Sequence, residues 1–148
     1  MIFLLRPLIE KGELFMNKKS DLKLAKEWFE IADSDWKYLQ AGLKNGGPVH
    51  TALILAQQIV EKYLKGFLVY QKGKEPKKTH NIAILLKQCA EHNAEFSEFL
   101  DVGKKLTSYY VKDRYPGGSE PIKYQKEDLS EILKAVEEII KLIKNKIV

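Results

Sequence analysis

One loop gathers the residue types that bind phosphate groups and nucleic-acid bases. Arg114 and Tyr115 lie in the stretch Tyr-Tyr-Val-Lys-Asp-Arg-Tyr-Pro-Gly-Gly, with Lys112 just before them. Arginine carries a planar fork of five donors that fits phosphate oxygens, and tyrosine rings stack on bases. Pro116 restricts the backbone of Tyr115 and so helps to hold Arg114 in one direction. We predict that Arg114 clamps a phosphate, with Lys112 and Tyr115 beside it. The alternative is that Arg114 pairs with an acid of the fold and the tyrosines are core residues with polar tips.

A second candidate site lies where Lys77, Lys78, Thr79 and His80 follow one another before a predicted helix. The free amides at a helix start attract anions, and two lysines and a histidine add positive charge. We therefore predict that Lys78 and His80 belong to the positive surroundings of a bound phosphate. The alternative is an ordinary capping segment whose histidine donates to a nearby carbonyl.

The third group is the polar run Gln-Gln-x-x-Glu-Lys-x-x-Lys that begins at residue 57 of an otherwise apolar helix. We predict that Glu61 orients Arg114, which leaves Lys62 and Lys65 available to an anion. The alternative is an ordinary surface pair between Glu61 and Lys65, four residues apart on one helix, which would stabilise the helix by about 0.2–0.5 kcal/mol.

Other kinds of chemistry find no support in the sequence. It contains no His/Asp/Glu spacing of a metal site, no Gly-rich phosphate loop and no nucleophile elbow, so we predict no metal, no cofactor and no catalytic triad. The single Cys89 excludes an internal disulfide and suits a reducing cytoplasm. No apolar run approaches the roughly twenty residues of a membrane span, so we predict a cytoplasmic protein with no membrane contact.

Charge favours an anionic partner. The chain of 148 residues has a formal net charge of +5, and the excess is local, because seven lysines and only one acid, Glu75, lie between Lys62 and Lys87. Such an excess suits a nucleotide, RNA, or an acidic protein surface. The alternative is a solvated Lys-rich surface of the kind that heat-adapted proteins carry.

The elements that position these residues are helices, because apolar residues recur at three- and four-residue steps and no period-two run occurs. We predict helices from a cap at Ser20 or Asp21 to Leu43, over 49–71, from a cap at Thr79 to about 91, over 95–111 and over 125–147. The fold predicted is all-α, an antiparallel up-and-down bundle of four to five helices. The helix over 49–71 has the broadest apolar stripe and should be central.

The start of the chain is predicted to be separate from this bundle. Gly12-Glu13 can be encoded by a ribosome-binding sequence shortly before a Met16 codon. We therefore expect residues 1–15 to be an N-terminal extension that arises from a start-site assignment, and residues 16–148 to form the helical bundle.

Several motifs resemble those of the HEPN family, a nucleotide-binding domain of higher eukaryotes and prokaryotes. A first-helix pattern around Ala25, Phe29 and Asp35 also fits the family, so the similarity covers roughly residues 20–145. The three main motifs are Ala52-x-x-x-Ala56-Gln57-Gln58-x-x-Glu61-Lys62-x-Leu64-Lys65, Pro76-x-x-Thr79-His80-Asn81-Ile82-x-x-Leu85-Leu86 and Arg114-Tyr115-Pro116.

The resemblance implies a bundle of four or five helices that is commonly a homodimer. It also implies a role in binding nucleotide or RNA, with a minimal nucleotidyltransferase protein as partner, in several cases as a toxin–antitoxin pair. Many members are metal-independent endoribonucleases that use an Arg followed four to six residues later by a His.

The sequence departs from the endoribonuclease motif, because residues 118–120 are Gly-Ser-Glu and no histidine follows His92. The missing imidazole is the usual acid–base group near neutral pH, and a phenol with a pKa of about 10 replaces it poorly. Whether the protein is an enzyme stays open, with Arg114 the best candidate for a catalytic residue. Three readings result: a nucleotide- or RNA-binding protein, a metal-independent endoribonuclease, and a protein-interaction module without a ligand.

Overall fold

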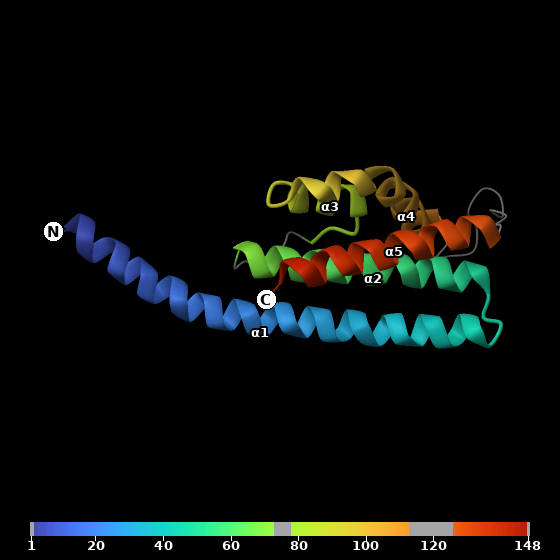
Figure 1. Ribbon diagram of the computed structural model, residues 1–148, viewed down its shortest axis with the longest axis horizontal. Coiled ribbons are helices and arrows are strands. Elements are labelled where there is room, and N and C mark those ends of the chain that lie inside the picture. The colour runs from blue at the N-terminus through green and yellow to red at the C-terminus, as the bar shows by residue number, and fades with distance from the viewer. Residues whose placement is uncertain (1, 73–77, 113–125, 148) are drawn as a thin grey trace.

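The computed structural model describes the backbone of residues 2–72, 78–112 and 126–147, and the side chains of residues 22–71, 78–109 and 127–147. Within these ranges every regular element is a helix, which confirms the predicted all-α fold (Figure 1). The elements are α1 (Ile2–Lys44), α2 (Val49–Lys72), α3 (Ile82–Ala90), the 3-10 helix η1 (Ala94–Phe99), α4 (Leu100–Lys112) and α5 (Lys126–Lys146).

A tight turn joins α1 and α2 into an antiparallel hairpin. Gly46 adopts a positive φ of 78°, which glycine reaches without steric cost. The amide of Gly47 donates to the carbonyl of Gly42 at 2.7 Å, and the amide of Gly46 donates to that of Leu43 at 3.2 Å. These bonds satisfy carbonyls at the end of α1, as the Asn-Gly-Gly-Pro sequence predicts.

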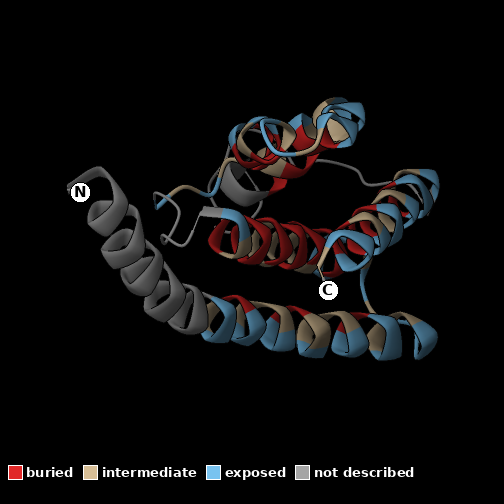
Figure 2. Ribbon diagram, turned by 60° about the vertical axis from the view of Figure 1, so that its left-hand side comes forward, coloured by how far each residue is buried: buried red, intermediate tan, exposed pale blue. Residues whose placement is uncertain are grey.

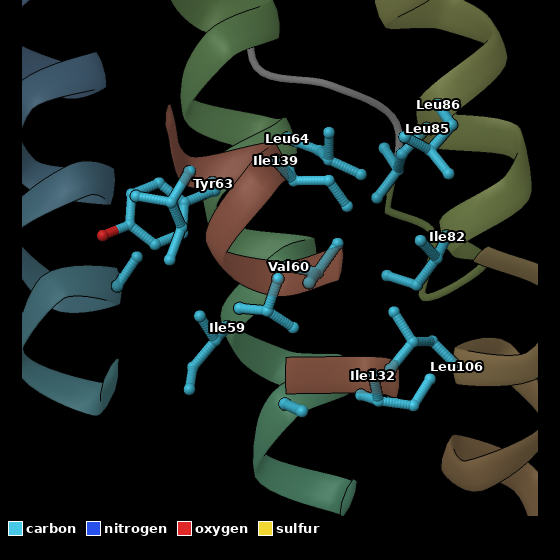
Figure 3. Packing of buried hydrophobic residues seen from close by; sticks show 14 of the residues in the cluster. Ile59, Val60, Tyr63, Leu64, Ile82, Leu85, Leu86, Leu106, Ile132 and Ile139 are labelled. Carbon is cyan, nitrogen blue, oxygen red and sulfur yellow. The ribbon is translucent and has the colours of Figure 1, made fainter. Parts of the chain in front are cut away.

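The helix α2 is the centre of the bundle, as its broad apolar stripe predicts. It contacts α1, α3, α4 and α5, and its residues are buried along most of its length (Figure 2). Side chains from all four neighbours meet those of α2 in one hydrophobic core, to which α1 contributes Ala32 and Leu39. Figure 3 shows the contributions of α3, α4 and α5. The core members labelled there are Ile59, Val60, Tyr63, Leu64, Ile82, Leu85, Leu86, Leu106, Ile132 and Ile139.

Two predicted helix starts are wrong. The first helix begins at Ile2 rather than at Ser20 or Asp21, and it passes through the boundary expected at Met16 without a break. Serine and aspartate also fit inside a helix, where they are less favourable than alanine by no more than about 0.7 kcal/mol. Such a residue therefore marks a helix start only where the residues before it do not themselves form a helix. Whether translation begins at Met16 stays a prediction.

The third helix begins at Ile82, and its N-cap is Asn81, two residues after the predicted cap Thr79. The Asn81 side chain accepts from the amide of Ile84 at 3.1 Å, whereas the Thr79 hydroxyl accepts from the amide of Asn81 at 3.1 Å. The fourth predicted helix is divided into η1 and α4.

The close approach of α1 and α2 generates a stability prediction. A Cβ added at Gly66 would lie 2.7 Å from the Phe29 ring and 2.9 Å from the Cβ of Trp28. We expect Gly66→Ala to lower the free energy of unfolding by about 1–3 kcal/mol through overpacking, measured by urea denaturation. The matched control is Gly42→Ala, where a Cβ meets nothing within 4 Å. This control should raise stability by about 0.5–1 kcal/mol, since alanine favours a helix interior. Equal stabilities of the two variants would contradict the close packing at Gly66.

Candidate functional site

The carboxylate of Glu61 is the centre of a polar cluster on α2. Its Oε1 accepts from the side-chain amide of Gln57 at 3.2 Å and lies 2.9 Å from Nδ1 of His80. Its Oε2 accepts from the ammonium of Lys65 at 3.1 Å. The Glu61 side chain is only 13% exposed. The four residues therefore form one connected network at the edge of the core.

The members of this network on α2 are unusually buried for polar residues. Gln57 is 0% exposed and Lys65 is 8% exposed. Burying a charge is costly unless it is paired, and Lys65 lies between the carboxylate of Glu61 and the ring of Trp28, whose centroid is 5.8 Å from the ammonium. The carbonyl oxygen of the Gln57 amide is buried and has no hydrogen-bond partner within the described part of the chain. The network is therefore built into the fold and is not a solvated surface pair.

The segment before α3 is held from two sides. On the α2 side, the amide of Gln57 donates to the backbone carbonyl of His80 at 3.3 Å. On the α4 side, the hydroxyl of Thr107 accepts from the amide of Ile82 at 2.9 Å. The His80 side chain nevertheless remains 53% exposed. The structure thus presents a histidine at the surface on a backbone that two helices position.

The anion pocket predicted at the start of α3 is only partly available. At the helix start that the structure shows, the amides of Ile82 and Ile84 already donate to Thr107 and Asn81. Lys78 is exposed. Lys78 and His80 therefore remain accessible, whereas these two helix-start amides serve the fold.

Lys62 belongs to a different set of contacts, between α2 and α1. Its ammonium pairs with the carboxylate of Asp35. The neighbouring Tyr63 donates its hydroxyl to Asp33, and Asp33 also lies 3.2 Å from the ammonium of Lys144 on α5. These contacts join α1, α2 and α5. They also pair the ammonium of Lys62 with a carboxylate of α1.

The predicted site residues are thus brought together in part. Glu61, Lys65 and His80 are in contact, and the i,i+4 pair between Glu61 and Lys65 that was the alternative reading is present. Both Lys62 and Lys65 are paired with acids and are not left over for a ligand in the structure. Arg114, Tyr115 and the side chain of Lys112 lie outside the described residues, so the contact between Glu61 and Arg114 stays a prediction.

Sequence reasoning gave no role to three residues that organise this region: Gln57 and Asp35, which it named only as parts of motifs, and Asp33, which it did not name. A signal for the two aspartates exists in the hairpin geometry. They lie about as far before Pro48 in the turn as Lys62 and Tyr63 lie after it, so antiparallel helices place them at the same height. Gln57 was visible as part of the polar run, but its bond to the His80 carbonyl depends on where the segment after α2 returns.

No group of three or more His, Cys, Asp or Glu side chains suitable for a metal ion occurs among the described residues. In the same part of the chain, no helix is long and apolar enough to cross a membrane.

Comparison with known proteins adds one finding. The family model described as HEPN domain matches residues 25–146, which is most of the chain and includes the whole Glu61 network. No curated protein and no solved structure gave a match.

The buried tyrosine generates a prediction about alkaline stability. Burial raises the pKa of Tyr63 well above its ordinary value, and the hydrogen bond to Asp33 and the charge of that carboxylate raise it further. Above about pH 10 the unfolded chain loses this proton while the folded chain keeps it, so stability that is fully present below pH 10 falls as pH rises. The stability advantage of wild type over Tyr63→Phe should shrink by about 1.4 kcal/mol per pH unit above that point.

Denaturant titrations between pH 9 and 11.5 measure this difference. The matched control is Tyr38→Phe, because the Tyr38 side chain is 76% exposed, and its curve should run parallel to that of wild type. A constant difference between wild type and Tyr63→Phe over this range would rule out the buried hydrogen bond.

Proposed function

Because the chain belongs to the HEPN domain family, we propose that it binds nucleotide or RNA through phosphate groups and acts with a minimal nucleotidyltransferase partner. The observation that carries this proposal is the family match over residues 25–146. The proposal includes a cytoplasmic homodimer that works as one component of a toxin–antitoxin pair.

Two features of the chain support a phosphate-binding role at the residue level. Arg114 is one of only two arginines in the chain, and Tyr115 and Pro116 follow it in the sequence. His80 and Lys78 are accessible on the segment before α3. In this proposal Arg114 clamps the phosphate, Lys112 and Tyr115 assist it, and the segment before α3 lines the other side of the ligand.

A second candidate function, a metal-independent endoribonuclease, is favoured by one specific observation. The part of the sequence after Arg114 lacks a histidine, but the structure holds the half-exposed imidazole of His80 against the carboxylate of Glu61. A positioned imidazole is the group that most often transfers protons in enzymes. RNA cleavage in EDTA that disappears in both Arg114→Ala and His80→Ala would establish this activity, and intact RNA after incubation with purified protein would reject it.

The phosphate clamp is tested by Arg114→Ala. The loss of a charged hydrogen bond costs about 1.5–3 kcal/mol, so RNA and nucleotide affinity should fall roughly ten- to a hundredfold. Fluorescence anisotropy with labelled RNA and calorimetry with ATP and GTP measure the change. The matched control is Arg6→Ala, since Arg6 is the other arginine and lies outside the family match. Unchanged affinity in a folded Arg114→Ala protein would remove Arg114 from the site.

The interaction-module reading is separated from ligand binding by thermal unfolding. A ligand that binds only the folded protein raises its stability by mass action. Co-purification with a nucleotidyltransferase, together with a melting temperature that no nucleotide or RNA changes, would favour a pure interaction module. A nucleotide-dependent increase in melting temperature supports the proposed function.

A further inference from the structure

We infer that the outer face of α5 binds the α5 of a second copy of this chain in antiparallel orientation, with each α5 lying in the groove between α1 and α5 of the other copy. This inference rests on the homodimer of the proposed function and deepens it, because it names the surface through which the two copies meet. None of the four residues of the Glu61 network lines this groove.

The outer face of α5 is uncovered in the described part of the chain. Figure 1 shows α5 in front of α2, with no other helix over it. The side of α5 that faces away from the core carries a stripe of exposed polar residues at four- and three-residue steps, which place them on one face of the helix. The stripe consists of Glu127, Glu131, Lys134, Glu138, Lys141 and Asn145. A second helix can therefore lie along α5.

The charges of this stripe are arranged symmetrically about Val136, the middle residue of α5. Glu131 and Lys141 lie five residues before and after it. Lys134 and Glu138 lie two residues before and after it. In an antiparallel pair of helices that cross at this point, positions equally far before and after it face each other. Each of these acids then faces a lysine of the other copy, and every pair occurs twice, as two-fold symmetry requires. The stripe is therefore complementary in charge to itself.

Contacts within one chain do not account for this arrangement. Lys134, Glu138 and Lys141 form no ion pair within the described ranges of the chain. Glu131 lies 3.8 Å from the ammonium of Lys105, and its side chain is 68% exposed. The helix macrodipole favours acids in the first turn and lysines in the last, but the four charged residues around the middle of α5 lie between those turns. Their charges are available to a partner.

The groove beside the stripe can hold the second helix. Both α1 and α5 pack on α2, and a groove of about 440 Å³ lies between them. The half-buried Trp36 and the buried Ile140 are its apolar lining residues. Exposed ion pairs contribute little to affinity by themselves, so a stable contact also needs apolar surface. Trp36 supplies that surface, and the aliphatic stems of the facing lysines can pack on it.

The test measures dimerisation of the full-length protein by analytical ultracentrifugation over a range of protein concentrations. Wild type should form a dimer whose dissociation constant rises with salt, because screening weakens pairs between exposed charges. Lys141→Glu should weaken the dimer roughly ten- to thirtyfold, because each dimer loses two ion pairs and gains two repulsions between like charges. The matched control is Lys104→Glu, which makes the same change of charge at an exposed position of α4 and should leave dimerisation unchanged.

The contact between copies is isolated by exchanging two charges in one chain, Glu131→Lys with Lys141→Glu. These positions are separated by about 15 Å along the helix, so they do not pair within one copy. Both are exposed, so the substitutions do not reach the core. Glu131→Lys alone should weaken the dimer as Lys141→Glu does. In the double variant opposite charges face each other again across the two copies, so dimerisation should return to within about threefold of wild type.

The outcomes separate this inference from the function on which it rests. Wild-type protein that stays monomeric at every concentration contradicts the proposed homodimer, and the inference fails with it. A dimer that neither single variant weakens overturns the α5 surface while the homodimer stands. Single variants that weaken the dimer without recovery in the double variant overturn the antiparallel pairing. Absence of RNA and nucleotide binding in a wild type that dimerises through α5 contradicts the ligand part of the proposed function and leaves this inference intact.

Discussion

The central position of α2 is the constraint on which the rest of the structure depends. Four helices pack against it, so a polar side chain along most of its length lies away from water. A buried polar group without a partner costs on the order of 1–3 kcal/mol, and a buried charge costs more. Gln57 and Lys65 donate hydrogen bonds to Glu61, which also contacts His80, and within the described part of the chain only the side-chain oxygen of Gln57 in this network is buried without a partner. The polar run of α2 is therefore a structural network before it is a binding surface.

The same constraint decides which cations face a ligand. A lysine on a helix that other helices surround pairs first with an acid of its own fold, as Lys62 does with Asp35 and Lys65 with Glu61. Of the predicted site residues that the structure describes, Lys78 and His80 remain accessible, and they lie in the segment of residues 78–81 just before α3. This segment keeps a fixed backbone because Gln57 and Thr107 hold it from opposite sides. Its histidine is thus both exposed and oriented, a combination that a loop without these two supports would not provide.

The sequence predicted most of the fold because helical periodicity is a local property. The predicted ranges 49–71 and 125–147 agree with α2 and α5 within one residue at each end. The predicted starts at Ser20 or Asp21 and at Thr79 failed, because several nearby residues can cap a helix and the choice among them is made by neighbours. The N-cap of α3 is Asn81. The amide of Ile82, the first residue of the helix, donates to the hydroxyl of Thr107 on α4. Of the candidate site, the sequence located the polar run and His80, but not the residues that support them.

By itself, the sequence determined an all-α bundle, the central helix and the family, and it gave the i,i+4 contact between Glu61 and Lys65 only as an alternative. Each of these follows from spacing along one chain segment or from ordered motifs. Only the tertiary structure decided that Glu61 also holds His80 and that Asp35 takes Lys62. Contacts of this kind depend on how each helix is rotated and at what height it packs, and these are set by the shape of the whole core. The role of Glu61 as the residue that orients His80 is therefore a result of packing that no single segment of the sequence contains.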